Sequence, residues 1–251
     1  MCVAAIAWQA HPRWRLVAIG NRDEYHDRPA APLGRWDGDV IAGRDLRSGG
    51  TWLGVAETGR FALVTNLRGY GERAPDKASR GTLVTDLLTA TGRYGDPDHA
   101  PIEDFNPFNL ILADTSEARF LSNRPEEVRT ALAHGIYGLS NGTLDAPWPK
   151  TLQLKGALTD WLTGDGRDLQ PLFAALRSES LANLGMAPRQ PSDIPREAPE
   201  TPVFIRDPVY GTRCSTVVAI DRSGAGTIAE RRFSPQGDIN GETLINFRWP
   251  G

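Results

Sequence analysis

Residues 2–24 read CVAAIAWQAHPRWRLVAIGNRDE and contain the clearest structural pattern in the chain. Two mostly apolar runs, 2–8 and 14–20, lie on either side of His11-Pro12. Short apolar runs that flank a turn signal are typical of two strands joined as a hairpin. We therefore expect an antiparallel pair of strands at the start of the chain.

The polar stretch Asn21-Arg22-Asp23-Glu24 ends the second of these strands. A hairpin returns the end of its second strand to the start of its first, so Arg22 should lie close to Cys2. A guanidinium beside a thiol lowers the thiol pKa and favours the thiolate. Asp23 or Glu24 would hold an α-ammonium group or fix Arg22. The alternative is a solvated charged turn.

Cys2 has the chemistry of a nucleophile. A small residue at this position permits removal of Met1, which would leave Cys2 with a thiol and a free α-amino group. Together these groups supply a nucleophile and a general base. The α-amino group has a pKa of about 7.7–8.0, so it accepts a proton near neutral pH. The alternative is that Cys2 is a small apolar residue that begins a buried strand.

A second hairpin is expected from residues 51–57 and 60–66, with Thr58-Gly59 as its turn. Between the two hairpins, residues 21–50 are rich in Pro, Gly, Arg and Asp, and we expect a long functional loop there. Apolar spacing predicts the remaining elements. These are helices at 81–91, 149–162 and 168–177, and strands at 108–114, 118–123, 135–140, 212–221, 226–233 and 243–248.

The predicted strands and helices come in separate runs. This order favours antiparallel sheets covered by helices over a parallel α/β sheet. The segment 187–202 is rich in proline, and an irregular surface loop is expected there. With no internal repeat and no boundary, we expect residues 1–251 to form a single domain.

The composition is that of an ordinary globular protein, with 40% hydrophobic and 24% charged residues among 251. A net charge of −3 does not favour a nucleic-acid partner. No apolar run reaches the ~18 residues that a membrane helix requires. The apolar start lacks a basic leader, so we expect no signal peptide and a cytoplasmic protein.

Metal-binding residue types are few in this chain, which has two cysteines and four histidines. The histidines show no paired metal spacing, and Cys2 lies far from Cys214 in sequence. We therefore expect no metal ion and no other cofactor. A disulfide between the two cysteines is not expected in a reducing compartment.

Several polar residues occupy unusual places at strand ends. Asn66 and Asn141 each end a predicted strand, where side-chain amides would stabilise an oxyanion. Ordinary turn chemistry is the alternative for both. Arg213 stands at the head of an apolar strand. Cys214 follows it, and we expect Cys214 to face the opposite side of the sheet as a packing residue.

Charged residues also crowd the chain after the first hairpin. Guanidinium groups bind carboxylate and phosphate groups through paired hydrogen bonds, so an excess of arginine here indicates an anionic ligand. The residues concerned are Arg28, Arg35, Arg44, Asp45, Arg47 and Arg68.

In their order along the chain, these motifs resemble the NRDE family, which includes the transport and Golgi organization protein 2 homologues. The resemblance covers nearly the whole chain except residues 163–205, and the pairing of NRDE with GGTWLG is highly specific. The matching motifs are MC at the start, NRDE at 21–24, GGTWLG at 49–54, TN at 65–66, FNL at 108–110, YGLSN at 137–141, PW at 147–148 and YGTR at 210–213.

The NRDE family is similar, more distantly, to the N-terminal-nucleophile (Ntn) hydrolases, and above all to the penicillin V acylase and choloylglycine hydrolase group. This resemblance implies an α+β fold. In this fold two antiparallel sheets pack face to face and helices cover them, which gives a four-layer αββα sandwich. It also implies cleavage of an amide by an N-terminal cysteine.

The same resemblance implies roles for individual residues. Cys2 matches the nucleophile, Arg22 the arginine beside the thiol, Asn66 and Asn141 the two asparagines, and Arg213 the late arginine.

One departure concerns the catalytic aspartate. The amidases place it three residues after the arginine, where this chain has Tyr25. Asp23 is adjacent to Arg22 and should point the other way in a strand. Asp23 and Glu24 are therefore both candidates for the acidic role. The remaining candidate binding residues are Asn21, Arg28 and Arg44.

Two functions remain open at this point. The first is hydrolysis of an amide by Cys2. The second is a non-catalytic carrier on the same scaffold, because the family is linked to Golgi organisation, lipid metabolism and haem handling. The partner in either case is an anionic small molecule, such as an N-acyl amide, an acyl thioester like acyl-CoA, or haem. An interaction protein with no small ligand is a third possibility.

Overall fold

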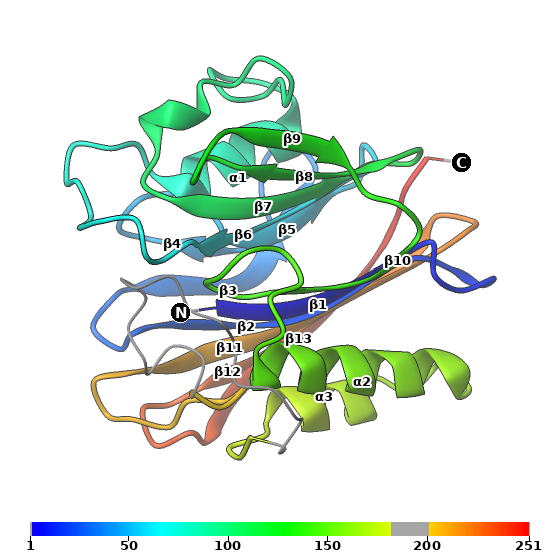
Figure 1. Cartoon of the computed structure of the whole chain (residues 1–251). Helices are drawn as coiled ribbons and strands as arrows, with labels where there is room; N and C mark the ends of the chain where they lie inside the picture. Colours follow the sequence, from blue (N-terminus) through cyan, green and yellow to red (C-terminus); the bar gives the residue numbers. More distant parts are fainter. Residues whose placement is uncertain (1, 182–200, 251) are drawn as a thin grey trace.

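The computed structural model describes residues 2–181 and 201–250. Two antiparallel sheets pack face to face, and helices lie on both outer faces (Figure 1). The αββα fold expected from the sequence is confirmed. The segment 187–202, where the sequence predicts an irregular loop, lies almost entirely outside the described residues.

The first sheet has six strands and contains the N-terminal hairpin. Its strand order is β10-β1-β2-β11-β12-β13, and all neighbours are antiparallel. The predicted pairing of the first two strands is confirmed, and β1 and β2 are central in the sheet. The strands are β1 Cys2–Trp8, β2 Trp14–Tyr25, β10 Gly135–Leu139, β11 Tyr210–Asp221, β12 Ala225–Phe233 and β13 Ile239–Arg248.

The second sheet is a seven-stranded meander in which neighbours in sequence are neighbours in space. The hairpin of β5 and β6 confirms the second predicted hairpin. The strands are β3 Ala30–Arg35, β4 Val40–Asp45, β5 Leu53–Ala56, β6 Arg60–Asn66, β7 Phe108–Ala113, β8 Ala118–Ser122 and β9 Val128–Ala131.

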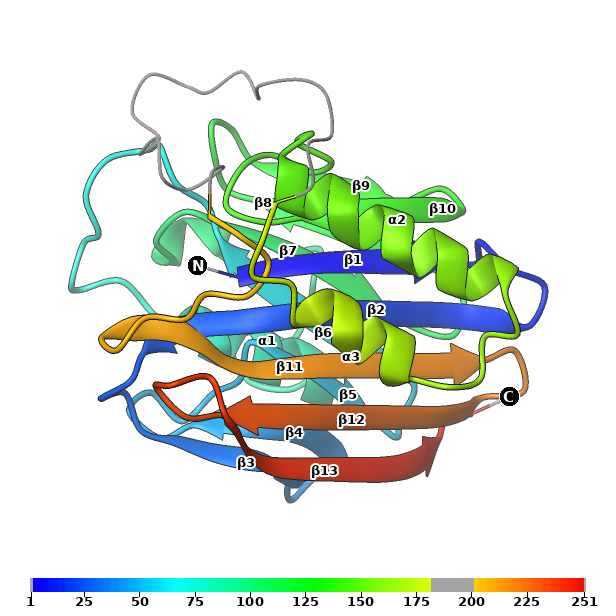
Figure 2. The same cartoon turned by 90° about the horizontal axis from the view of Figure 1, so that it is seen from below.

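The helices form the two outer layers. Helix α1, Arg80–Thr89, packs on the second sheet, and α2, Pro149–Thr163, packs with α3, Gln170–Leu176, on the first sheet (Figures 1 and 2). A single 3₁₀ turn, Ile102–Asp104, precedes β7. The three predicted helices are therefore confirmed, with ends that differ by at most two residues.

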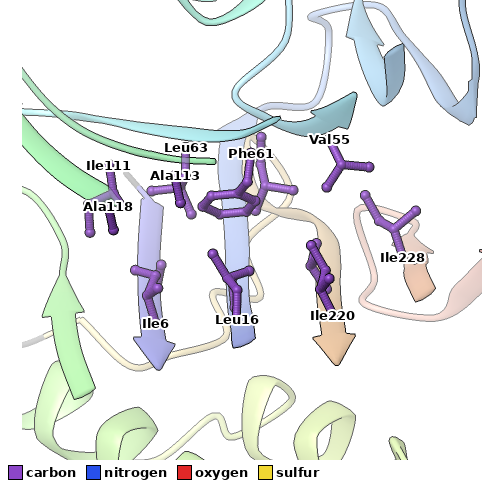
Figure 3. Close-up of a cluster of buried hydrophobic side chains, with 14 of the residues drawn as sticks. Ile6, Leu16, Val55, Phe61, Leu63, Ile111, Ala113, Ala118, Ile220 and Ile228 are labelled. Atoms are coloured by element: carbon purple, nitrogen blue, oxygen red, sulfur yellow. The ribbon is translucent and has the colours of Figure 1, made fainter. Parts of the chain in front are cut away.

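A continuous apolar layer between the sheets forms the central core (Figure 3). Successive side chains of a strand point to opposite faces. Ile6 of β1 accordingly lies between the sheets, whereas Ala5 packs against the helices. The side chains labelled in Figure 3 are Ile6, Leu16, Val55, Phe61, Leu63, Ile111, Ala113, Ala118, Ile220 and Ile228.

The structure corrects the prediction that residues 21–50 form one long loop. Strand β2 continues through NRDE to Tyr25 because β11 pairs with it along its whole length. Strands β3 and β4 form a further hairpin at the edge of the second sheet. These two strands contain small and polar residues, so their sequences lack the apolar run or alternation that predicts a strand. The short edge strand β9 is also missing from the prediction, since only four residues form it.

Glycines in the GGTWLG stretch let the layers approach closely. Gly49 has a positive φ of 79°, which residues with a side chain rarely adopt. A Cβ atom on Gly50 would lie 2.2 Å from the backbone carbon of Gly81 at the start of α1. A Cβ atom on Gly20 of β2 would lie 3.1 Å from the ring of Trp52. The GGTWLG stretch therefore packs closely against the start of α1 and against β2 of the first sheet.

Candidate active site

The register of three strands brings Cys2, Arg22 and Cys214 into one row across the first sheet. Cys2 pairs with Arg22, and Arg22 pairs on its other side with Cys214. Directly paired residues of antiparallel strands point to the same face. This face is the inner one, because Ala4 and Ala18 farther along the same strands belong to the core between the sheets. The adjacency of Cys2 and Arg22 that the hairpin predicts is present.

The same row separates the two cysteines. Cys2 and Cys214 lie on either side of Arg22, so two strand spacings, roughly 10 Å, separate their backbones. A disulfide requires Cα atoms within about 7 Å. Both thiols are free, and neither can reach the other without displacing β2.

The four residues of NRDE divide between the two faces of the sheet. Arg22 and Glu24 point inward, whereas Asn21 and Asp23 point toward the helices. The Asn21 amide donates to the carbonyl groups of Leu176 and Val203, both at 2.8 Å, and its oxygen accepts from a serine of β11. Asn21 therefore connects β2 to the helical layer.

Cys2 is the first residue of β1 and is partly buried. Burial raises the pKa of its thiol, and the negative charge of Asp23 raises it further. A hydrogen bond from the Asp23 backbone N–H and the charge of Arg22 oppose this increase. Ser140 donates its hydroxyl hydrogen to the Cys2 carbonyl oxygen at 2.9 Å. The thiol is therefore protonated near neutral pH and needs a base to become a nucleophile.

Arg22 belongs to a charged cluster on the inner face. Its Nη2 lies 2.9 Å from Asp45 Oδ2 and 3.7 Å from Glu24. Arg28 binds the same carboxylate through Nε at 2.5 Å and Nη2 at 3.2 Å. Burial alone would raise the pKa of Asp45, but hydrogen bonds from Arg28 and the Ser48 backbone, with both arginine charges, lower it to about 2. Asp45 is therefore ionised and holds both guanidinium groups.

Asp23 forms a separate buried group with Thr212 and Lys150 on the helix-facing side. The Thr212 hydroxyl donates to Asp23 Oδ1 at 2.7 Å. Burial raises the pKa of Asp23 to about 6, although Thr212 and the charges of Lys150 and Arg22 oppose this shift. Burial lowers the pKa of Lys150 to about 8, against the charges of Asp23 and Cys2. The Lys150 ammonium lies 5.6 Å from the Trp148 ring centre.

The two asparagines meet where β6 and β10 end. The Asn141 amide donates to the Asn66 carbonyl oxygen at 2.8 Å, and Asn141 is fully buried. The register of β1 with β10 places Asn141 beside Cys2. The Asn66 side chain is exposed. The structure thus brings both asparagines to the start of β1, with the Asn141 amide engaged by backbone.

Arg213 lies in a β-bulge between Thr212 and Cys214. Its Nη1 donates to the carbonyl oxygens of Tyr25 and Arg28, at 2.8 and 3.0 Å. Burial and the nearby charge of Arg22 lower its pKa. Because a bulge interrupts the alternation of side chains, Arg213 and Cys214 line the same pocket. The prediction that Cys214 faces away from Arg213 is therefore wrong.

The pocket occupies about 90 Å³ between the two sheets. Arg22, Arg44 and Arg213 all contribute to its wall. Arg44 is exposed and stacks over the Trp36 ring at 4.7 Å. Cys2 lies on the opposite side of Arg22 from Cys214, and Asn21 lies on the other face of the sheet. Arg22 therefore lies between Cys2 on one side and the pocket on the other.

Lys150 and Glu230 are absent from the residues predicted from the sequence. Lys150 precedes Leu154 by four positions, so helical spacing places it on the buried face of α2, and this signal is present in the sequence. Glu230 lies inside an apolar strand, where alternation does not distinguish a buried carboxyl group from an exposed one.

The described residues contain neither a membrane-spanning helix nor a metal-binding cluster. No helix within 2–181 and 201–250 is long and apolar enough to cross a membrane. Across the same ranges, no group of three or more His, Cys, Asp or Glu side chains is placed to hold a metal ion.

Comparison with known proteins supports the family expected from the motifs. The family model described as "Transport and Golgi organisation 2" matches residues 1–235. The chain belongs to this family. The transport and Golgi organization protein 2 homolog of Bos taurus is 34% identical, with 98% of each chain covered. The Mus musculus homolog of this family is 29% identical, with 97% of each chain covered.

Solved structures share the fold of this transport and Golgi organisation 2 family member. A mutant of the conjugated bile acid hydrolase from Clostridium perfringens has a TM-score of 0.55 at 10% identity, with 100% of this chain and 97% of that chain covered. A second variant of that enzyme has a TM-score of 0.52, also at 10% identity, with 99% and 97% covered. At this identity the similarity establishes the Ntn-hydrolase-like fold alone.

Proposed function

We propose that this protein hydrolyses a non-peptide amide bond with Cys2 as the nucleophile, after removal of Met1. The observation that supports the proposal most strongly is the pairing of Cys2 with Arg22 at the end of a central strand, on the inner face of the sheet. The Ntn-hydrolase-like fold and the family match agree with such a reaction.

The chemistry follows from the groups around Cys2. The α-amino group accepts the thiol proton while the sulfur attacks the amide carbonyl carbon. Asparagine amides at positions 66 and 141 would stabilise the resulting oxyanion. The proton then passes to the leaving nitrogen as the C–N bond breaks, which leaves an acyl thioester on Cys2. Water attacks this thioester, releases the acid and restores the thiol.

The proposed acidic partner of the α-amino group is Asp23. A backbone amine lies in the plane of the sheet, so a carboxylate on the helix-facing side can approach it while the thiol faces inward. Thr212 and the charge of Lys150 hold the carboxyl group in place. Glu24 lies 3.7 Å from both Arg22 and Arg28, so it is better suited to order the arginines.

One observation favours the carrier alternative. One N–H of the Asn141 amide donates to the backbone of Asn66, so only its second N–H is left for an oxyanion. An arginine-lined pocket without turnover would suit a protein that binds an anionic acyl thioester or haem. The two functions make different predictions for Cys2.

Replacement of Cys2 tests the proposal directly. Cys2→Ser retains the size of the side chain but supplies a weaker nucleophile, so we expect turnover of N-acyl amides to fall at least about a hundredfold. Arg248→Met is the control, because Arg248 is exposed on the edge strand β13, away from Cys2, and its replacement should leave turnover intact. The measurement is hydrolysis of an N-acyl amide and acyl thioester panel, with intact mass showing loss of Met1.

The carrier alternative is tested with the same proteins. Haem and acyl-CoA binding is measured at equilibrium, with mass spectrometry for an acyl group on Cys2. Tight binding without adduct or turnover, in protein that has lost Met1, would contradict the hydrolase proposal. Equal turnover by the Cys2→Ser protein would contradict it as well.

A further inference from the structure

The pocket between the sheets shares Arg22 with the proposed active site and includes Cys214, on the side of Arg22 away from Cys2. It contains Cys214 and Glu230 from the first sheet, and Trp52 and Phe233 form apolar walls. Four arginines but only two carboxylates line it. One of those carboxylates, Asp45, is already shared between two arginines. The remaining wall therefore carries an excess of positive charge.

The arginines of this pocket are arranged by strand register. Cys214 pairs with Arg22 on one side and with Arg232 on the other, so the three residues form one row across the sheet. Arg232 in turn pairs with Gly241 of β13. A Cβ atom on Gly241 would lie 2.0 Å from the Arg232 guanidinium. Glycine at this position therefore provides the space that the arginine occupies.

Both arginines retain a buried N–H group that the protein leaves unpaired. Arg22 Nη1 and Arg232 Nε are inaccessible to solvent and have no hydrogen-bond partner within residues 2–181 and 201–250. Buried donors without partners are rare in folded proteins and unfavourable to stability. Two such donors on one pocket wall indicate that an acceptor from outside completes the site.

Glu230 limits what can bind there. Its carboxyl group accepts from the Leu33 backbone at 2.9 Å and from the Cys214 thiol. Arg232 Nε lies 3.9 Å from this carboxyl group, too far for a hydrogen bond. Burial raises the pKa of Glu230, so its charge is disfavoured. Glu230 thus leaves the Arg232 donor available to another acceptor.

We propose that the pocket between Arg22, Cys214, Glu230 and Arg232 is a binding site for an anionic oxygen group, a carboxylate or a phosphate, of a small-molecule ligand. A volume of about 90 Å³ has room for one such group. Guanidinium groups on either side match the geometry of these anions.

The shared arginine connects this site to Cys2. Arg22 pairs with Cys2 on one side and lines the pocket on the other. We therefore expect the anionic end of the ligand in the pocket and its amide at Cys2, and this step rests on the proposed hydrolysis. The reaction would then prefer amides that carry a carboxylate or phosphate over neutral analogues.

The site is tested by nuclear magnetic resonance titration of the intact protein with acetate, phosphate and neutral acetamide. We expect saturable binding of an anion and none of acetamide; the tighter of acetate and phosphate identifies the group. Arg232→Met should weaken anion binding at least about tenfold, as expected for loss of a charge-assisted hydrogen bond. Glu230→Gln keeps the shape and an acceptor oxygen and should bind the anion at least as tightly as the wild type. Arg248→Met, on an exposed arginine of β13, is the control.

The titration measures binding and not turnover, so its result does not depend on hydrolysis. Equal effects of acetate and acetamide would overturn the proposal. So would unchanged anion affinity in a folded Arg232→Met protein. If the protein also hydrolyses amides, its preference for anionic over neutral substrates should disappear in Arg232→Met and persist in Arg248→Met. Turnover without that preference would overturn only the connection to Cys2.

Discussion

Asp45 determines the orientation of the arginine that the candidate site shares. Its carboxylate binds Nη2 of Arg22 and two nitrogens of Arg28, and the Ser48 backbone completes its shell. Nη1 of Arg22 has no hydrogen-bond partner among the described residues, and it is the atom that the proposed anion would bind. The carboxylate of Asp45, at the end of β4, thus fixes the side chains of Arg22 and Arg28.

Asp45→Asn should therefore destabilise the protein by about 2–4 kcal/mol, because it leaves two partly buried guanidinium groups without their counter-ion. The pKa of Asp45 is about 2 in the folded protein, below its ordinary value. The unfolded chain then binds more protons between about pH 4 and pH 2, so Asp45 loses its stabilising effect as the pH falls through this window.

The measurement is urea unfolding of the wild type and Asp45→Asn from pH 5 to pH 2. We expect the difference between them to shrink as the pH falls. Asp23 acts in the opposite direction, since its pKa of about 6 makes its ionisation unfavourable as the pH rises from about 4 to 6. Below pH 4 the effect of Asp23 is complete, so the change in unfolding free energy between pH 4 and pH 2 reports on Asp45. A constant difference down to pH 2 would contradict this role of Asp45.

At the residue scale, the sequence predicts contacts that follow from strand pairing. Arg22 beside Cys2 is such a case, because a hairpin with a short turn allows few registers. The Asp45 contact is different, since it joins β2 to the other sheet, and no local pattern indicates which carboxylate a given arginine will bind. Helical spacing could have identified Lys150 as a buried residue, but nothing in the sequence indicates that it lies near Asp23.

At the scale of elements, pairing with β11 holds the NRDE residues in an extended strand. The apolar run of the second strand stops at Gly20, yet β2 continues to Tyr25 because Tyr210 and its neighbours pair with it. This pairing joins residues almost two hundred positions apart, which no window of local sequence contains. The bulge before Cys214 has the same origin and moves Arg213 toward the pocket.

The GGTWLG stretch makes a prediction about these packed elements. Gly50→Ala would place a Cβ atom 2.2 Å from the Gly81 backbone, so α1 or the loop must move. We expect a loss of about 1–3 kcal/mol or more, as overpacking against a fixed backbone requires. The measurement is the midpoint of thermal unfolding.

Gly156→Ala is the matched control for Gly50→Ala. Gly156 lies within α2, and no atom lies within 4 Å of its added Cβ. Alanine is the better helix former, so this change should stabilise the protein by about 0.5–1 kcal/mol. Equal effects of the two substitutions would show that the close contact with Gly81 has no energetic importance.

At the scale of the whole molecule, the alternation of apolar residues determines the layers. Every second residue of β1 and β2 enters the core between the sheets, and the others contact the helical layer. Because both faces of these strands are buried, their sequences are almost continuously apolar, and this pattern makes the fold predictable. The candidate site lies where the pattern ends, at Cys2 and NRDE.

This separation predicts that core and site can be perturbed independently. Phe61 is fully buried between the sheets near Ile6 and Leu16 (Figure 3). Phe61→Ala should reduce the free energy of unfolding by about 3–5 kcal/mol through lost burial and a cavity. Leu244→Ala is the control, since Leu244 is 59% exposed on β13 and should change stability little.

The anion site should retain its affinity in the same Phe61→Ala protein. Ile6, beside the substituted ring, lies four residues along β1 from Cys2, which is roughly 13 Å for an extended strand. Cavities in close-packed cores relax mainly in their immediate surroundings, so the row from Cys2 through Arg22 to Arg232 should keep its register. Acetate or phosphate titration at a temperature where Phe61→Ala is folded tests this expectation. A large loss of affinity in folded protein would mean that the packing between the sheets, and not strand register alone, positions the two guanidinium groups.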